Sequence, residues 1–212
     1  MRALLALAVM LVLAQVGQPY PSTAWLHHVP TALLLLAAPT LIRRWPLSDG
    51  AVIGLVLFFA LHTLGGRYTY SNIPYDHWAE ALTGHSLSGA FGWSRNHYDR
   101  LVHCAFGALF YAPVREAALR YAGCSARLAM LFAVGFVLSI GALYEILEGM
   151  LTLMADPAVA DDYNGQQGDI WDAQKDMALA FSGAILAALL TRFSERRRYA
   201  RGRSVLVVPQ PL

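Results

Sequence analysis

Three carboxylates stand at helical spacing directly before an apolar run that is long enough to cross a bilayer: Asp169, Asp172 and Asp176. At about 100° per residue, steps of three, four and seven place them within roughly 60° of one another on one helix face. Because the helix continues into lipid, this face must be solvated, paired with cations or bound to a metal ion.

Further imidazoles and carboxylates stand at the ends of other apolar runs. His62 lies near the end of one run, and Asp99 and His103 are four residues apart at the start of another. Glu145 and Glu148 are three residues apart within a longer run. Carboxylates inside a membrane are costly and usually functional, so we predict that these groups meet in one pocket on one side of the membrane.

Several carboxylates gathered in a low-dielectric pocket raise one another's pKa and cannot all stay ionised without cations. A divalent ion would neutralise them, and a mixed set of imidazole and carboxylate ligands suits zinc, manganese or iron. Such an ion activates water for hydrolysis, with a spare carboxylate as general base. The predicted metal ligands are His62, Asp99, His103, Asp169 and Asp176. The predicted catalytic residues are Glu145, Glu148 and Asp172.

A long connection rich in tyrosine and tryptophan, residues 67–98, is expected to cover this pocket. Its aromatic content argues against disorder and is typical of a membrane interface. Within it, residues 76–82 are predicted to form a short interfacial helix. Substrate contacts are predicted in and beside this connection, for Arg67, Tyr70, Tyr75 and Arg100.

Simpler roles are open for several of these groups. Asp169 is as readily a cap of the last helix, because acidic residues favour helix N-termini. Asp172 is placed to pair with Lys175 or Arg100, and His62 and His103 are equally expected as hydrogen-bonded histidines inside a bundle. A purely structural network of arginines and carboxylates therefore stays an alternative to a metal site.

The composition of the chain predicts the fold that positions these residues: an all-α fold, a polytopic transmembrane helix bundle. Of the 212 residues, 57% are hydrophobic and only 14% are charged, which suits a single integral membrane domain. About six spans are predicted, at residues 3–17, 25–42, 51–64, 99–118, 126–154 and 171–193. An acidic loop, 155–168, precedes the last span, and a basic tail, 194–212, follows it.

The first apolar run is short for a span. It is either a retained anchor, which we favour because the other runs insert without it, or the core of a signal peptide.

Positive charge orients the bundle. With the arginine-rich tail in the cytoplasm, alternation of the spans places most of the sixteen basic residues inside and most of the acidic residues outside. The polar pocket and the aromatic connection then face the extracytoplasmic side of a bacterial inner membrane.

The sequence also argues against several classes of function. Cys104 and Cys124 lie near opposite ends of one predicted span, too far apart for a disulfide, and the chain has no Cys-x-x-Cys motif. No basic patch interleaved with aromatic residues suggests nucleic-acid binding. The segment 84–88 approaches a nucleophile elbow but has Ser88 where the second glycine belongs.

Four linked motifs carry a resemblance to a known family: G-G-R-Y-T-Y-S-N-I-P-Y (65–75), N-H-Y-D-R-L-V-H (96–103), Y-E-I-L-E (144–148) and Q-G-D-I-W-D-A-Q-K-D-M (167–177). The chain resembles the YjdF-like family of uncharacterised bacterial inner-membrane proteins over roughly residues 51–190. Its D-x-x-x-D pattern also distantly resembles VanZ-like membrane proteins. The resemblance implies a membrane topology and no particular reaction.

The leading functional prediction is a metal-dependent hydrolase that acts on a lipid-linked or envelope substrate. Two alternatives come from other classes: an ion- or proton-coupled transporter, and a non-catalytic membrane protein whose polar groups form a salt-bridge network. The lipid bilayer is the one partner that the composition requires, and protein partners are not indicated.

Overall fold

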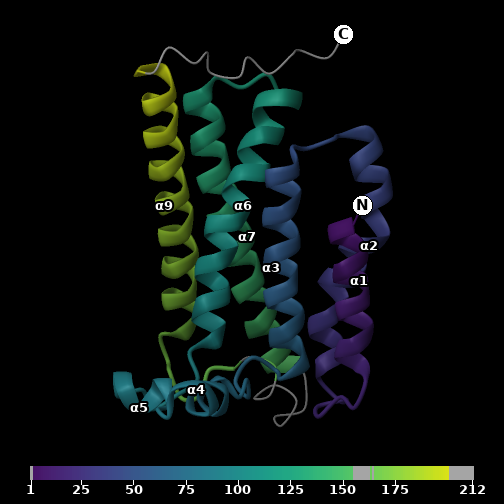
Figure 1. Cartoon of the computed structure of the whole chain (residues 1–212), viewed down its shortest axis with the longest axis vertical. Helices are drawn as coiled ribbons and strands as arrows, with labels where there is room; N and C mark the ends of the chain where they lie inside the picture. Colours follow the sequence, from purple (N-terminus) through teal and green to yellow (C-terminus); the bar gives the residue numbers. More distant parts are fainter. Residues whose placement is uncertain (1, 155–162, 164, 201–212) are drawn as a thin grey trace.

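The computed structural model describes residues 2–154, 163 and 165–200, and every regular element within these ranges is a helix (Figure 1). The predicted all-α class is therefore confirmed. Most of the predicted acidic loop 155–168, and residues 201–212 of the predicted tail, lie outside the described residues.

Among the described residues, six helices run along the bundle and two short ones lie across one of its ends. The bundle helices are α1 (Arg2–Gln15), α2 (Ala24–Arg44), α3 (Asp49–Arg67), α6 (Tyr98–Tyr121), α7 (Ala126–Met154) and α9 (Asp172–Ala200). The short helices are α4 (Tyr75–Thr83) and α5 (Leu87–Phe91). Helix α4 covers the segment predicted to form a short interfacial helix, whereas α5 was not predicted.

Helix α6 is the centre of the bundle, because it packs against α3, α7 and α9 (Figure 1). Helix α3 in turn carries α2 and α1 on its other side. The contact between α6 and α9 is unusually close, since Gly107 of α6 lies against the backbone of Ala180 and Gly183 of α9 lies against that of Cys104. Small residues at a crossing allow two backbones to approach each other, as in many membrane helix pairs.

Four of the helices, α2, α3, α7 and the Asp172–Arg197 part of α9, are long and apolar enough to cross a membrane. Their outer faces carry large exposed apolar side chains, among them Leu36, Leu57, Leu131 and Leu189. Exposure of this kind all around a bundle is expected in lipid rather than in water. Helix α1, with 14 residues, is shorter than a full span, and the crossing of α1 and α6 stays a prediction.

The short helices form a cap over the end of the bundle where α3 ends and α6 and α9 begin (Figure 1). Ser88 N–H donates to Asp76 Oδ1 over 2.8 Å, which ties α5 to α4, and Trp93 stacks on Phe91 with ring centres 4.8 Å apart. Hydrogen bonds from Ser88 lower the pKa of the half-buried Asp76 carboxyl. The opposite end of the bundle carries the arginines that close α2, α6 and α9.

Helix α1 is attached to α3 through one guanidinium. Arg67 donates from Nη1 to the carbonyls of Ala14 and Val16, over 2.8 and 2.9 Å, and from Nη2 to that of Gly17 over 3.3 Å. Ala14 stands in the last turn of α1, and Val16 and Gly17 directly follow the helix, so Arg67 acts as a C-terminal cap of α1.

We expect Arg67→Met to lower stability by about 1–3 kcal/mol, because hydrogen bonds from a charged donor are lost while the apolar stem stays. The thermal midpoint of the detergent-solubilised protein measures this effect. Arg44→Met is the matched control, since Arg44 only lies over the Trp45 ring at 5.0 Å. Equal midpoints for the two variants would show that Arg67 does not hold α1.

Candidate functional site

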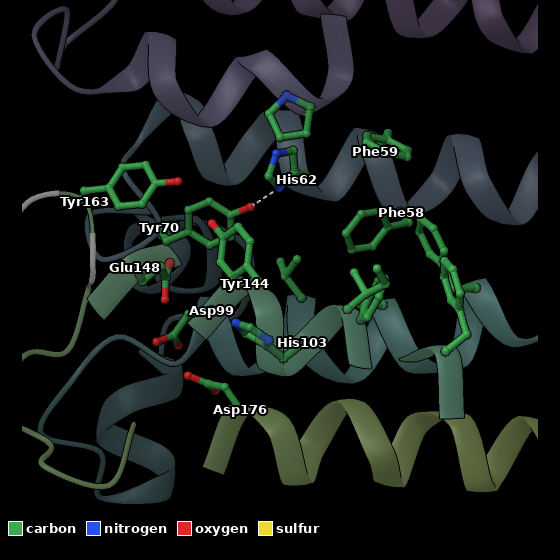
Figure 2. A pocket seen from close by; sticks show the side chains of 17 residues that line it. Phe58, Phe59, His62, Tyr70, Asp99, His103, Tyr144, Glu148, Tyr163 and Asp176 are labelled. Carbon is green, nitrogen blue, oxygen red and sulfur yellow. Dashed lines mark hydrogen bonds between the residues drawn. The ribbon is translucent and has the colours of Figure 1, made fainter. Parts of the chain in front are cut away.

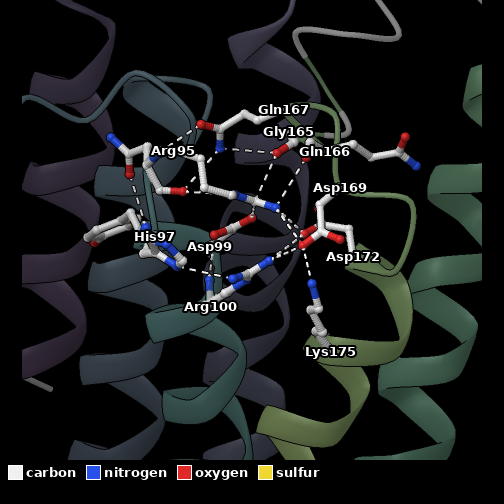
Figure 3. A network of polar contacts seen from close by, with 12 residues as sticks. Arg95, His97, Asp99, Arg100, Gly165, Gln166, Gln167, Asp169, Asp172 and Lys175 are labelled. Carbon is white, nitrogen blue, oxygen red and sulfur yellow. Dashed lines mark hydrogen bonds and ion pairs between the residues drawn. The ribbon is translucent and has the colours of Figure 1, made fainter. Parts of the chain in front are cut away.

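The carboxylates predicted from the sequence form two layers at the capped end of the bundle. The outer layer is a network centred on Arg95, which lies in the segment between α5 and α6 (Figure 3). Its guanidinium pairs with Asp99 of α6 at 2.5 Å and with Asp172 of α9. The same group donates to the carbonyls of Gly165 and Gln166 over 3.2 and 3.1 Å. Arg95 therefore joins the starts of α6 and α9.

Burial alone would lower the pKa of Arg95, but the surrounding carboxylates raise it, so Arg95 is a permanent cation. Its side chain is only 9% exposed, and that of Asp172 is 5% exposed. Charges this well buried are stable only when they are paired.

Arg100 and Lys175 complete the outer layer around Asp169. Arg100 contacts Asp169 and lies 3.5 Å from Asp172, and Lys175 Nζ lies 2.6 Å from Asp169 Oδ2. Asp169 also accepts the Trp171 N–H over 3.1 Å, which places it just before the start of α9 as a cap. The predicted pairing of Asp172 with Arg100 and the predicted capping role of Asp169 are both seen in this geometry.

The pKa of Asp169 is held at about 2 by the hydrogen bond from Lys175, with the Trp171 N–H and Arg100 adding to it. Because this pKa lies below the usual 3.8, the stabilisation from the ion pairs of Asp169 is complete above pH 3.8. It is lost as the pH falls toward 2.

His97 connects the network to the cap. Burial, followed by the charge of Arg100, lowers the pKa of His97. Its neutral ring accepts a hydrogen bond at Nδ1 from Arg100 Nη1 over 3.2 Å. The backbone N–H of His97 donates to the Tyr75 hydroxyl over 3.1 Å. Tyr75, a predicted substrate contact, belongs to α4 and therefore holds the cap in place.

The inner layer lies deeper in the bundle and has a different character. His103 of α6, Glu145 of α7 and Asp176 of α9 each offer one ligand atom, and these atoms all lie within 4.8 Å of one another. His103 Nε2 is 3.8 Å from Glu145 Oε1, too long for a hydrogen bond. Glu145 Oε1 and Asp176 Oδ1 are both buried without a hydrogen-bond partner among the described residues. Buried oxygens of this kind call for a bound cation or proton.

A second group overlaps with the first at Asp176. Asp99, Asp172 and Asp176 also bring one oxygen each within 4.8 Å of one another. Asp99 and Asp172 are already paired with Arg95, however, and Arg100 lies 3.5 Å from Asp172. The set of His103, Glu145 and Asp176 is therefore the better candidate for a metal ion, and its mixture of one imidazole and two carboxylates suits zinc, manganese or iron.

A cavity of about 290 Å³ opens beside the inner layer (Figure 2). This volume is close to the lower end of the range of small-molecule sites, about 300–1,000 Å³. Polar groups line one end, and Figure 2 shows Phe58 and Phe59 toward the other. The polar lining residues are His62, Tyr70, Asp99, His103, Tyr144, Glu148, Tyr163 and Asp176.

His62 lines the cavity but uses both of its ring nitrogens. Nε2 donates to the His27 carbonyl over 2.7 Å, and Nδ1 accepts a hydrogen bond from the Tyr70 hydroxyl. Burial raises the pKa of Tyr70 well above its usual value, so the phenol keeps its proton. Among the predicted metal ligands, His62 is thus the one whose contacts match the alternative of a hydrogen-bonded bundle histidine.

Tyr70 reaches His62 because the chain turns sharply after α3. Thr69 and Tyr70 have φ angles of 48° and 57°, in the left-handed region that side chains rarely adopt. The turn also needs Gly65, where a Cβ would lie 2.8 Å from the Tyr70 ring. Strained backbone is often retained at functional sites. Here it directs a tyrosine into the cavity, where a substrate contact was predicted.

The remaining predicted substrate contacts lie elsewhere. Arg67 caps α1 and Arg100 belongs to the outer network, and neither is among the described residues that line the cavity. Glu148, predicted to be catalytic, does line it.

Sequence reasoning missed three residues around the polar end, namely His27, Tyr144 and Tyr163. His27 is 1% exposed and stacks on Tyr163 with ring centres 4.4 Å apart. Two consecutive histidines within the apolar run of α2 were the available signal. Polar residues inside a span usually face the bundle interior.

The fold and the site define a multi-pass helical membrane protein with a polar pocket at one end. The model of the family described as "Predicted membrane protein (DUF2238)" matches residues 1–197, and the chain belongs to this family. The chain is also 32% identical to "Inner membrane protein YjdF" of Escherichia coli (strain K12) over 196 residues, which cover 91% of this chain and 90% of that protein. The resemblance to a YjdF-like family is therefore confirmed, and with it placement in the inner membrane. No solved structure matches the chain.

Proposed function

We propose that this protein is a membrane-embedded, metal-dependent hydrolase whose ion is held by His103, Glu145 and Asp176. The observation that carries the proposal is a pair of buried oxygens, Glu145 Oε1 and Asp176 Oδ1, which have no hydrogen-bond partner in the described part of the chain and lie beside an imidazole. The chemistry of the three donors fits zinc, manganese or iron. The substrate class is a lipid-linked or envelope molecule, because the cavity beside the site is buried in an apolar bundle.

A bound ion would supply Lewis acidity and lower the pKa of a coordinated water. Glu148 lines the same cavity and is the candidate general base. Asp99 and Asp172 orient the site, because Arg95 fixes both and with them the starts of α6 and α9. Tyr70 and Tyr144 line the polar end, where their phenol oxygens can accept hydrogen bonds from a substrate, while the Tyr70 O–H donates to His62.

The proposal includes a topology. Helices α1 and α6 join the four apolar helices as spans, giving six, with the cap of α4 and α5 on the extracytoplasmic side and the arginine-rich end of α9 in the cytoplasm. The separation of the two ends supports it, because the arginines that close α2 and α9 lie opposite the cap (Figure 1).

The two alternatives account for less of the geometry. A salt-bridge network explains the outer layer well, but within the described residues it leaves Glu145 Oε1 and Asp176 Oδ1 without a hydrogen-bond partner. A transporter needs a polar route toward the other end of the bundle. The cavity instead ends at Phe58, Phe106 and Phe110, which supports hydrolysis over transport.

Elemental analysis of the detergent-purified protein tests the proposal. After incubation with zinc, manganese or iron and removal of free metal, the wild type is expected to retain an ion. Glu145→Gln keeps the shape of the side chain and removes one ligand charge, and it is expected to weaken metal binding at least about tenfold. His103→Ala is expected to do the same.

His85→Ala is the matched control, because His85 is exposed in the cap. It is expected to retain metal fully. A wild type that retains none of the three metals, or a Glu145→Gln variant with unchanged metal content, would rule out this site.

A further inference from the structure

The cavity has an apolar half that the proposed hydrolytic chemistry does not use. Five phenylalanines line it: Phe58, Phe59, Phe106, Phe110 and Phe136. Several of these rings contact one another with centres between 4.7 and 6.1 Å apart: Phe106 and Phe59 are each tilted against Phe110, and Phe58 is edge-on to it. A hollow with walls this apolar is not a favourable place for water, which needs polar partners.

The wall of this half is incomplete on one side. Helices α3 and α7 both pack along α6, but within the described part of the chain they hardly pack against each other. The cavity lies between them, lined by Phe59 on one side and by Phe136 and Ile140 on the other. Ile140 is also 38% exposed. Because no close packing of α3 on α7 closes this side within the described residues, it is the side on which the cavity can open toward lipid.

A buried glycine keeps the space open. Gly141 lies in the middle of α7 and lines the cavity, and a Cβ built there would meet nothing within 4 Å. Glycine inside a helix costs about 0.5–1 kcal/mol relative to alanine. Because no neighbouring helix comes close to Gly141, close helix packing does not explain why a glycine stands there. The space that its missing side chain leaves is part of the cavity, next to Tyr144.

From these observations we infer that the apolar half binds the hydrocarbon chain of a single-chain lipid, which enters from the bilayer between α3 and α7. The chain lies among the phenylalanines, and the head group reaches the end formed by His103, Glu148 and Asp176 (Figure 2). No arginine or lysine is among the described residues that line the cavity. A neutral head group therefore needs no further partner there, whereas an anionic one needs the proposed metal ion. The inference deepens the proposed function by naming its substrate class, and for the head group it rests on that function.

Photolabelling tests the chain site without requiring the metal. The probe is dodecanol with a diazirine in its chain, added to phospholipid vesicles that contain the full-length protein. After irradiation, mass spectrometry measures label on α6 around Phe106, which is 8% exposed, relative to label on the lipid-facing part of α1. Preferential label on α6, reduced by excess unlabelled dodecanol, is the expected result. Label confined to the outer faces would overturn the inference.

Two matched variants make the test specific. Gly141→Phe fills the cavity and is expected to lower the α6 label at least about tenfold. A tenfold loss of affinity is what the lost burial of a few methylene groups of the probe would cause. Gly135→Phe places the same side chain on the same helix at an exposed position with nothing within 4 Å of its Cβ, and it is expected to change nothing. Equal labelling of the two variants would overturn the chain site.

The metal variant separates this inference from the proposed function. Glu145→Gln is expected to keep the α6 label, because dodecanol carries no charge. A protein that binds no metal but labels at α6 would contradict the hydrolase and support the chain site. A protein that binds metal but is labelled only on its outer faces would support the hydrolase and contradict the chain site.

Discussion

Arg95→Ala is expected to destabilise the protein by about 3–5 kcal/mol, the usual cost of removing one partner from a buried ion pair. Arg95 pairs with both Asp99 and Asp172, which are 12% and 5% exposed as side chains. Without it, two carboxylates are left facing each other beside Asp176, and they repel. The thermal midpoint of the detergent-solubilised protein measures the loss.

Two further variants identify the cause. Lys175→Ala removes a cation from the same network, but Lys175 is 48% exposed, so the expected cost is at most about 1 kcal/mol. Arg95→Ala combined with Asp172→Asn removes one unpaired charge and is expected to recover part of the stability. If Arg95→Ala costs no more than Lys175→Ala, then Arg95 does not hold the outer layer together.

The helices of this protein could be predicted closely from the sequence, because apolar runs of bilayer length leave little freedom. The predicted run 126–154 coincides with α7 (Ala126–Met154), and 25–42 lies within α2 (Ala24–Arg44). The shared helix face was predicted correctly for Asp172 and Asp176, which are four residues apart in α9, but not for Asp169, which precedes the helix.

The division of the carboxylates into two layers could not be predicted, because it depends on contacts between distant segments. Arg95 belongs to a connection whose path is decided by the cap and by its bonds to the 165–166 carbonyls. Arg67 was predicted to bind substrate, and nothing in the spacing of the sequence shows that the end of α1 lies beside it. The partners of His62 likewise come from the turn at Thr69 and Tyr70 and from α2.

The second large effect is expected at the crossing of α6 and α9, which brings the two helices close enough to share the inner layer. A Cβ at Gly107 would overlap the Ala180 carbonyl, and one at Gly183 would overlap that of Cys104. Both obstacles are backbone atoms, so neither can move aside as a flexible side chain would. Alanine at either position therefore has to push the helices apart.

We expect Gly107→Ala to cost about 1–3 kcal/mol or more, in the range of overpacked cores. Because α9 carries Asp176 and α6 carries His103, the same change is expected to weaken metal binding. Gly135→Ala is the matched control, since its Cβ meets nothing within 4 Å, and it is expected to stabilise α7 by up to about 1 kcal/mol. Thermal midpoints and metal content measured on both variants check the prediction. If Gly107→Ala were as stable as Gly135→Ala, the backbones of α6 and α9 would have to lie further apart than the structure places them. The close placement of His103 and Asp176 as ligands of one ion would then lose its geometric basis.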